Sequence, residues 1–214
     1  MGVVTIHEYA VAAGYVGSVL GVVMVVPQIA RVARHPSLPG VSALSWSLTT
    51  ISCLGWMTYG IRTRALPQIP GNVLLIVGAV SVVLLIDAGT ARGRRATLLA
   101  GACAAQLVMV WMIPASDVGY YASLIGLFSS LPQLYDSFGN WRARRDSSVS
   151  VSTWILRIAS QICWLLYAIG TVEVPVGIAA GVALSTAIAL VTLELAARSA
   201  AAAQSVSSPF AEAA

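Results

Sequence analysis

The sequence VVPQIARVARHPSLPGVSALSW, residues 25–46, contains the pattern that decides the fold. A Pro-Gln pair closes an apolar run, an arginine-bearing loop follows, and a Val-Ser-x-x-x-Trp segment opens the next apolar run. The same pattern returns as SLPQLYDSFGNWRARRDSSVSVSTW, residues 130–154. Self-similarity of this kind is typical of an internally repeated architecture, so the chain is expected to contain two copies of one unit.

The similarity between the two copies extends well beyond these stretches. Before the arginine-bearing loop the copies are offset by 105 residues, and after it by 108, because the second loop carries three additional residues near 141–145. The matched positions are Gly14, Tyr15, Ser18, Gly21, Pro27 and Gln28 with Gly119, Tyr120, Ser123, Gly126, Pro132 and Gln133, and Val41, Ser42, Trp46, Trp56, Tyr59, Ile61 and Pro67 with Val149, Ser150, Trp154, Trp164, Tyr167, Ile169 and Pro175.

The composition places both copies in a membrane. Of the 214 residues, 58% are hydrophobic and 9% are charged, whereas a soluble domain carries about 25% charged residues. The uncharged stretches are 9–30, 35–61, 65–86, 96–116, 118–135 and 174–193, and a seventh stretch, 147–172, is interrupted only by Arg157. A membrane helix needs about 20 apolar residues and a membrane strand about ten alternating ones. We therefore predict an all-α integral membrane protein with seven transmembrane helices.

The seven spans and the duplication together predict the domain organisation. Three crossings end on the opposite face of the membrane from where they begin, so a second copy lies parallel to the first only if one more helix returns the chain. We expect a 3+1+3 arrangement: a first three-helix repeat at 9–88, an inversion linker helix at 96–113, a second repeat at 117–197 and a disordered cytosolic tail at 198–214. Transporters built from parallel repeats hold their substrate near the midplane, between the halves.

The arginines predict the orientation. With seven spans, nine of the twelve arginines lie on the side of the odd-numbered connections and the C-terminus, while only Arg62 and Arg64 lie on the other side. The positive-inside rule then places the C-terminus in the cytosol and the N-terminus outside. Basic residues that are all arginine, together with abundant alanine, favour a GC-rich genome and hence a bacterial plasma membrane.

The sequence contains few residues suited to catalysis, to metal binding or to nucleic-acid binding. Cys53, Cys103 and Cys163 fall in apolar stretches and are expected to be free thiols, and the histidines are His7 and His35 alone. No nucleophile, base and orienting group occur together within a span, so neither an enzyme nor a cofactor is expected. A net charge of +4 is too small to favour nucleic acid. The expected partners are the lipid bilayer and a small-molecule substrate, with homo-oligomerisation left open.

Pro27 and Pro132 are expected near the cytosolic ends of the first and fifth spans. A proline inside a helix removes a backbone hydrogen bond and makes a kink, and the amides of the adjacent Gln28 and Gln133 could satisfy the groups that the kink releases. Either proline taken singly is better explained as a helix terminus. Their matched recurrence, each time before an arginine-bearing loop, favours a pair of hinges.

With these motifs the chain resembles the PQ-loop superfamily, and within it the SWEET and half-sized SemiSWEET sugar transporters, over residues 11–195. The resemblance rests on the two stretches quoted above, on GWMTYG at 55–60 and on ALPQIPGN at 65–72. It implies two three-helix bundles that rock around a central site and carry a small polar solute, foremost a sugar. The superfamily also contains lysosomal amino-acid exporters and the KDEL receptor. An exporter of amino acids or other charged metabolites, and a non-transporting receptor, are therefore the alternatives.

The resemblance also implies a tryptophan on the second helix of each repeat and an asparagine on the third. These positions map to Trp56 and Asn72 in the first repeat and to Trp164 and Ala180 in the second, so the second asparagine is missing. A tryptophan face packs on the C–H surface of a sugar ring, and an amide bonds its hydroxyls. The alternative is that Asn72 makes a hydrogen bond between helices and that the tryptophans face lipid.

Arg157 makes the predicted site asymmetric. It is four residues from Gln161 and seven from Trp164, on one helical face, whereas its repeat mate is Thr49. Arg157 could donate to a polyol, to a carboxylate or phosphate, or to backbone carbonyls; equally, it could snorkel to the cytosolic headgroups. With the matched small residues of each repeat, the candidate substrate-binding residues are Ser52, Trp56, Asn72, Arg157, Ser160, Gln161 and Trp164.

The acidic residues favour energy-independent transport. A proton-driven carrier needs a titratable group within the membrane, but the acids near the spans all lie at their boundaries: Asp87, Asp117, Asp136, Glu173 and Glu194. Asp136, three residues beyond Gln133, is the only one close to a predicted hinge.

Overall fold

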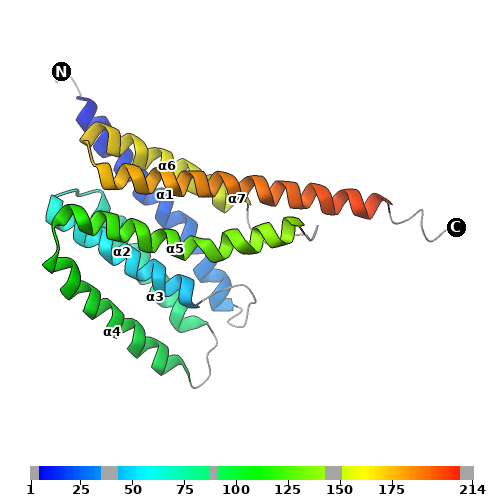
Figure 1. Cartoon of the computed structure of the whole chain (residues 1–214), viewed down its shortest axis with the longest axis horizontal. Coiled ribbons are helices and arrows are strands. Elements are labelled where there is room, and N and C mark those ends of the chain that lie inside the picture. The colour runs from blue at the N-terminus through cyan, green and yellow to red at the C-terminus, as the bar shows by residue number, and fades with distance from the viewer. Residues whose placement is uncertain (1–4, 35–42, 87–90, 143–150, 208–214) are drawn as a thin grey trace.

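The described part of the chain folds into seven α-helices. The structure, a computed structural model, describes residues 5–34, 43–86, 91–142 and 151–207, apart from the side chains of 28, 31, 133, 136, 140 and 201–207 (Figure 1). The helices are α1 Ile6–Arg34, α2 Ala43–Thr63, α3 Gln68–Leu85, α4 Ala91–Met112, α5 Ala115–Arg142, α6 Val151–Thr171 and α7 Val174–Ser207. The described ranges contain no strand, so the predicted all-α fold is confirmed.

Five of the helices are long and apolar enough to cross a membrane: α1, α3, α4, α6 and the Val174–Ala200 part of α7. The chain is therefore a multi-pass membrane protein. The other two helices, α2 and α5, have 21 and 28 residues but are more polar. Within α2, the hydroxyls of Ser47, Thr49, Thr50 and Thr58 donate to carbonyls one turn back. Polar side chains satisfied in this way are compatible with a membrane helix, and the seven crossings stay a prediction.

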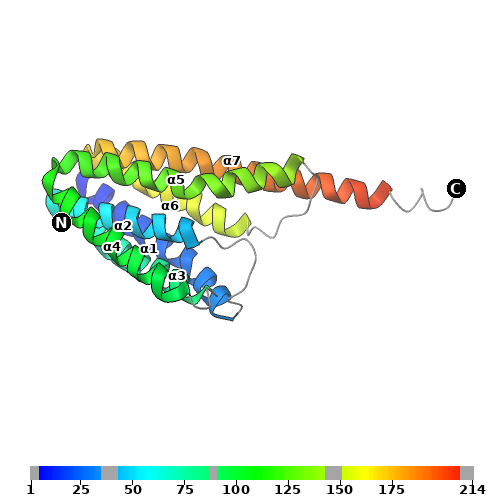
Figure 2. The same ribbon diagram turned by 60° about the horizontal axis from the view of Figure 1, so that its bottom comes forward.

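The helices pack in two sets of three. α3 packs against both α1 and α2, and α7 packs against both α5 and α6. The two sets meet where α1 contacts α6 and where α2 contacts α5. α4 contacts α2, α3 and α5 and lies at the edge of the molecule (Figures 1 and 2). This packing agrees with the expected division into two repeats and a linker helix, which stays a prediction.

α4 is held to α2 by polar contacts. The Gln106 side chain donates from Nε2 to the carbonyl oxygen of Ile51, at 2.8 Å. Near the other end of α4, the Arg62 guanidinium donates to the carbonyl oxygens of Val110 and Ile113 and lies over the ring of Trp111, with Cζ 5.3 Å from its centroid. Arg62 therefore satisfies carbonyls at the C-terminus of α4, where a cation is favourable.

Close contacts between the two sets of helices are duplicated. A Cβ atom added to Gly14 of α1 would lie 2.8 Å from Tyr167 Cδ2 and 2.9 Å from Pro67 Cβ. One added to Gly119 of α5 would lie 3.0 Å from Tyr59 Cε2 and 2.7 Å from Pro175 Cβ. These six residues form three pairs of repeat mates. Each glycine thus admits a tyrosine from the opposite set and the proline at the start of the third helix of its own set.

The turns that follow α2 and α6 are also alike. Arg64 and Val172, which are repeat mates, both have a φ of 60°. This left-handed conformation is uncommon for residues other than glycine and especially unfavourable for a β-branched one. The same uncommon backbone at equivalent positions indicates that the two copies of the sequence fold alike.

Three helices run further than the sequence led us to expect. α7 continues to Ser207, so residues 198–207, expected to belong to a disordered tail, are helical; alanine, which fills 200–203, has the highest helix propensity. Residues 208–214 lie outside the described part of the chain. α1 continues to Arg34 and α5 to Arg142, so Pro27 and Pro132 lie inside helices and do not mark their ends.

The duplicated glycine contact yields a stability prediction. Gly119→Ala is expected to destabilise the protein by about 1–3 kcal/mol, because the new methyl group would overlap Pro175 and Tyr59. Thermal unfolding of the purified protein in detergent measures the change. Gly101→Ala on α4 is the matched control: nothing lies within 4 Å of the added atom, and alanine is favoured over glycine in a helix by about 1 kcal/mol. Equal stability of Gly119→Ala and the wild type would contradict the close approach.

Candidate functional site

The two predicted tryptophans approach one buried cluster from opposite halves of the molecule. Trp56 on α2 and Trp164 on α6 are both partly buried and pack against this cluster. Each meets edge-on the tyrosine that follows it by three residues, with ring centroids 5.6 Å apart and interplanar angles of 84° for Trp56 with Tyr59 and 88° for Trp164 with Tyr167. Such edge-to-face pairs hold both rings in defined orientations.

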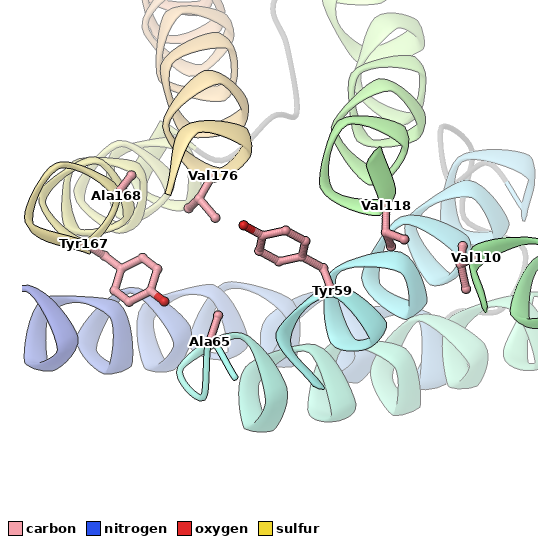
Figure 3. Close-up of a cluster of buried hydrophobic side chains, with 7 residues drawn as sticks. All are labelled: Tyr59, Ala65, Val110, Val118, Tyr167, Ala168 and Val176. Carbon is pink, nitrogen blue, oxygen red and sulfur yellow. The ribbon is translucent and has the colours of Figure 1, made fainter. Parts of the chain in front are cut away.

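The cluster closes one end of the bundle. Its members come from both sets of helices and from α4: Tyr59, Ala65, Val110, Val118, Tyr167, Ala168 and Val176. Figure 3 shows Tyr59 and Tyr167 extending toward each other from α2 and α6. They lie where α2 and α6 end and α3, α5 and α7 begin, the end that the arginine distribution predicts to face outside.

Glu173 adds a polar latch to this closed end. The Tyr59 hydroxyl donates to Glu173 Oε2, which links α2 to the turn between α6 and α7. Sequence analysis placed Glu173 only at a span boundary. The signal that could have singled it out is its asymmetry, because the repeat mate of Glu173 is the buried Ala65.

The two candidate serines make equivalent hydrogen bonds between the halves. Ser52 Oγ donates to the carbonyl oxygen of Ala122, and Ser160 Oγ donates to that of Gly17, both at 2.9 Å. Gly17 and Ala122 are themselves repeat mates, so one bond joins α2 to α5 and the other joins α6 to α1. Both hydroxyl protons are used by the protein in this conformation.

Asn72 is buried on α3 and bonds within its own helix. Its Nδ2 donates to the Gln68 carbonyl oxygen at 2.6 Å and lies 3.4 Å from Gln68 Oε1. Asn72 therefore does not form the hydrogen bond between helices that was the alternative to substrate binding. The side-chain carbonyl of Asn72 is the group left to accept from a solute hydroxyl.

Arg157 is partly buried on α6. Its Nε is buried and has no hydrogen-bond partner, and its Cζ lies 5.4 Å from the centroid of the Trp154 ring. The described parts of α2 and α6 do not pack against each other. Both interpretations of Arg157, a substrate contact and snorkelling to the cytosolic headgroups, stay predictions.

The structure gives fewer contacts for the remaining predicted residues. Gln161 is partly buried one turn from Arg157, at the position equivalent to Cys53. Pro27 and Pro132 are exposed on α1 and α5, where each leaves a carbonyl four residues earlier without its helical partner. The side chains of Gln28 and Gln133 lie outside the described part of the structure.

Glu194 is a buried acid that sequence analysis placed at the end of the last span. Because α7 continues to Ser207, Glu194 lies inside the helix with none of its surface exposed, and its Oε1 accepts a 2.6 Å hydrogen bond from Ser137 Oγ on α5. Its Oε2 has no hydrogen-bond partner. In the first repeat, Ser137 corresponds to Val32 and Glu194 corresponds to Ile86. Both counterparts are apolar, and this asymmetry between the repeats is detectable in the sequence. Asp136, the other acid considered, lies outside the described side chains.

Among the described residues, no group of three or more histidine, cysteine or acidic side chains could hold a metal ion. Cys53, Cys103 and Cys163 are free thiols.

Comparisons with known proteins identify the fold. No protein-family model matches the sequence, and no curated protein has a significantly similar sequence. A solved structure described as "The 3.7 A resolution structure of a eukaryotic SWEET transporter" is similar to this chain with a TM-score of 0.77 and 15% sequence identity, over 91% of this chain and 99% of that one. The chain therefore has a SWEET-like fold.

The serine bonds between the halves yield a prediction on stability. Ser52→Ala and Ser160→Ala should each destabilise the purified protein by about 0.5–1.5 kcal/mol, the usual net contribution of one buried hydrogen bond. Thermal unfolding in detergent without any solute measures the loss. Ser81→Ala is the control, because Ser81 bonds only to the preceding turn of α3 on an exposed surface. Unchanged stability of both variants would show that these bonds do not hold the halves together.

Proposed function

We propose that the protein is a membrane transporter that moves a small polar solute by energy-independent alternating access between two three-helix bundles. The observation that carries the proposal is the pair of tryptophans, Trp56 and Trp164, presented by equivalent helices of the two halves toward one closed end. Paired aromatic faces suit a sugar ring, and the amides of Asn72 and Gln161 suit its hydroxyls. A sugar is therefore the first solute proposed, and the SWEET-like fold supports this choice.

Rocking of the two bundles requires an end of the bundle that can close, a contact between the halves that persists in both states, and a point at which helices can bend. The tyrosine cluster with Glu173 supplies the closed outer end. The α1–α6 and α2–α5 contacts, each with its serine bond, would serve as the persistent contact. Pro27 and Pro132, with the neighbouring Gln28 and Gln133, would let the cytosolic ends of α1 and α5 bend, since each proline removes a helical hydrogen bond.

The topology belongs to the same proposal. The chain would cross the membrane seven times, with the repeats at 9–88 and 117–197, helix 96–113 as the inverting linker, the N-terminus outside and the C-terminus in the cytosol of a bacterium. Because one chain carries both halves, no second copy is needed to complete the site. The buried Glu194 lies about 30 Å from the start of α7, near the cytosolic boundary and away from the midplane, which keeps energy-independent transport as the proposal.

A second candidate function is export of an amino acid or another charged metabolite. Arg157 favours it, since a partly buried guanidinium without a hydrogen bond at Nε is suited to an anionic group. Transport of neutral sugars and of charged metabolites by the same purified protein distinguishes the two candidates.

Counterflow in proteoliposomes tests the sugar proposal. Labelled glucose, sucrose and arabinose are the probes, and Trp56→Ala and Trp164→Ala should each reduce flux by about fivefold to tenfold, because loss of one aromatic contact of about 1 kcal/mol weakens binding by that factor. The matched control is Trp111→Ala, which removes a tryptophan that is 58% exposed on α4. Flux that falls equally in all three variants would contradict the assigned site. Absence of flux for every solute would overturn the transporter itself.

The latch yields a prediction on outer-end opening. Tyr59→Phe should raise the rate at which an impermeant maleimide added outside modifies Val176→Cys by about tenfold, because loss of a hydrogen bond to a charged group favours the open state. The background replaces the three native cysteines with alanine. Tyr9→Phe, on a tyrosine 66% exposed on α1, is the control. Labelling that is unaffected by Tyr59→Phe would show that the tyrosine and Glu173 do not hold this end closed.

A further inference from the structure

Arg157 carries a positive charge for which the described protein provides no counter-ion. A guanidinium stays protonated in a protein. Among the described residues, no acidic side chain contributes to the electrostatics of Arg157. Its Nε is buried without a hydrogen bond, and its aromatic neighbour, Trp154, offers a ring face and no negative charge. Arg157 is partly buried on a helix long and apolar enough to cross a membrane, where a charge without a counter-ion is costly, so this position requires a reason.

The carboxylates of Glu173 and Glu194 are hydrogen-bonded to residues other than Arg157. Glu173 accepts from Tyr59 at the outer end, and Glu194 accepts from Ser137 between α5 and α7. Neither interacts with Arg157. Among the described residues, the negative charge that would complete this position is therefore absent from the protein, and a solute can supply it.

The position of Arg157 suits a solute that touches both halves. Arg157 shares a face of α6 with Gln161 and Trp164, and Trp164 packs against the buried cluster to which both halves contribute. The equivalent residue of the first half, Thr49, donates its hydroxyl back to the Ser45 carbonyl. Only the second half therefore offers a cation, and a bound solute would have one charged end and one neutral end.

We infer that the transported solute is a small organic anion of sugar size, whose carboxylate pairs with Arg157 while its remaining surface lies against the tryptophan pair. This inference rests on the transport function proposed above and, of its two candidate substrates, selects the charged metabolite over the neutral sugar. The planar fork of a guanidinium matches a carboxylate with two parallel hydrogen bonds. A phosphate group shares this chemistry, and the probes below separate the two.

Three probes with the same ring test the charge: glucose, glucuronate and glucose 6-phosphate. Binding to the purified full-length protein is measured by calorimetry at pH 7, and flux by counterflow in proteoliposomes. The wild type should bind an anionic probe at least about tenfold more tightly than glucose, a factor typical of one charged hydrogen-bonded pair. Tighter binding of glucuronate assigns a carboxylate, and tighter binding of glucose 6-phosphate assigns a phosphate in its place.

Arg157→Gln should remove the preference for the anion over glucose, because glutamine keeps hydrogen-bonding capacity and loses the charge. Arg157→Lys should retain part of the preference. Arg92→Gln, on the exposed start of α4, controls for net charge. Asp136→Asn controls for the acid of α5 whose side chain lies outside the described part of the structure. An anion preference that survives in Arg157→Gln overturns the inference.

A further measurement does not depend on the choice of probe. If the cation is unpaired in the empty protein, Arg157→Met should raise the midpoint of thermal unfolding without solute, since an apolar side chain of similar length removes the buried charge. A lowered midpoint would show that the protein itself compensates Arg157, and would overturn the inference. Flux of glucose but of neither anion would also overturn it while leaving the transporter in place, whereas anion binding without any flux would overturn transport alone.

Discussion

Two serine hydroxyls join the halves of this bundle, and the rest of the structure depends on the close approach that they require. Ser52 donates to Ala122 and Ser160 to Gly17, each at 2.9 Å, so the backbones of α5 and α1 must come near α2 and α6. In a membrane, apolar side chains gain little by leaving lipid, and helices associate through close packing of small residues and polar contacts. Glycines meet this requirement where Gly14 and Gly119 admit a tyrosine from the other half.

Although the two halves share this packing, they differ at several positions that carry polar or charged side chains. Glu173 stands where the first repeat has Ala65, Arg157 where it has Thr49, and Asn72 where the second repeat has Ala180. The matched residues, serines, glycines and tyrosines, build the interface twice. Among the unmatched residues, Glu173 bonds Tyr59 at one end of the bundle and Arg157 has a buried Nε without a hydrogen bond. Under the proposed function, equivalent backbones with unequal side chains would let one duplicated scaffold hold a solute in a single orientation.

Much of the fold could be predicted from the chain, but the site only in part. The helical class, the duplicated unit and the seven helices followed from apolar length and from matched residues, since these depend on local sequence. Helix ends were less accessible: α7 extends through alanines that look like a disordered tail, and Pro132 lies inside α5. The tryptophan pair was found from its repeat. The partners of Ser52 and Ser160 were not, because they lie 70 and 143 residues away.

The sequence by itself determined that the chain enters a membrane as helices and that one unit occurs twice, because hydrophobic length and internal similarity are properties of the chain whatever its conformation. Only the tertiary structure decided that Glu194 is buried against Ser137, that Tyr59 meets Glu173, and that the Nε of Arg157 is buried without a hydrogen bond. The free energy of a charge or hydroxyl depends on the groups around it. Those groups come from helices far apart in the sequence, so folding alone brings them together.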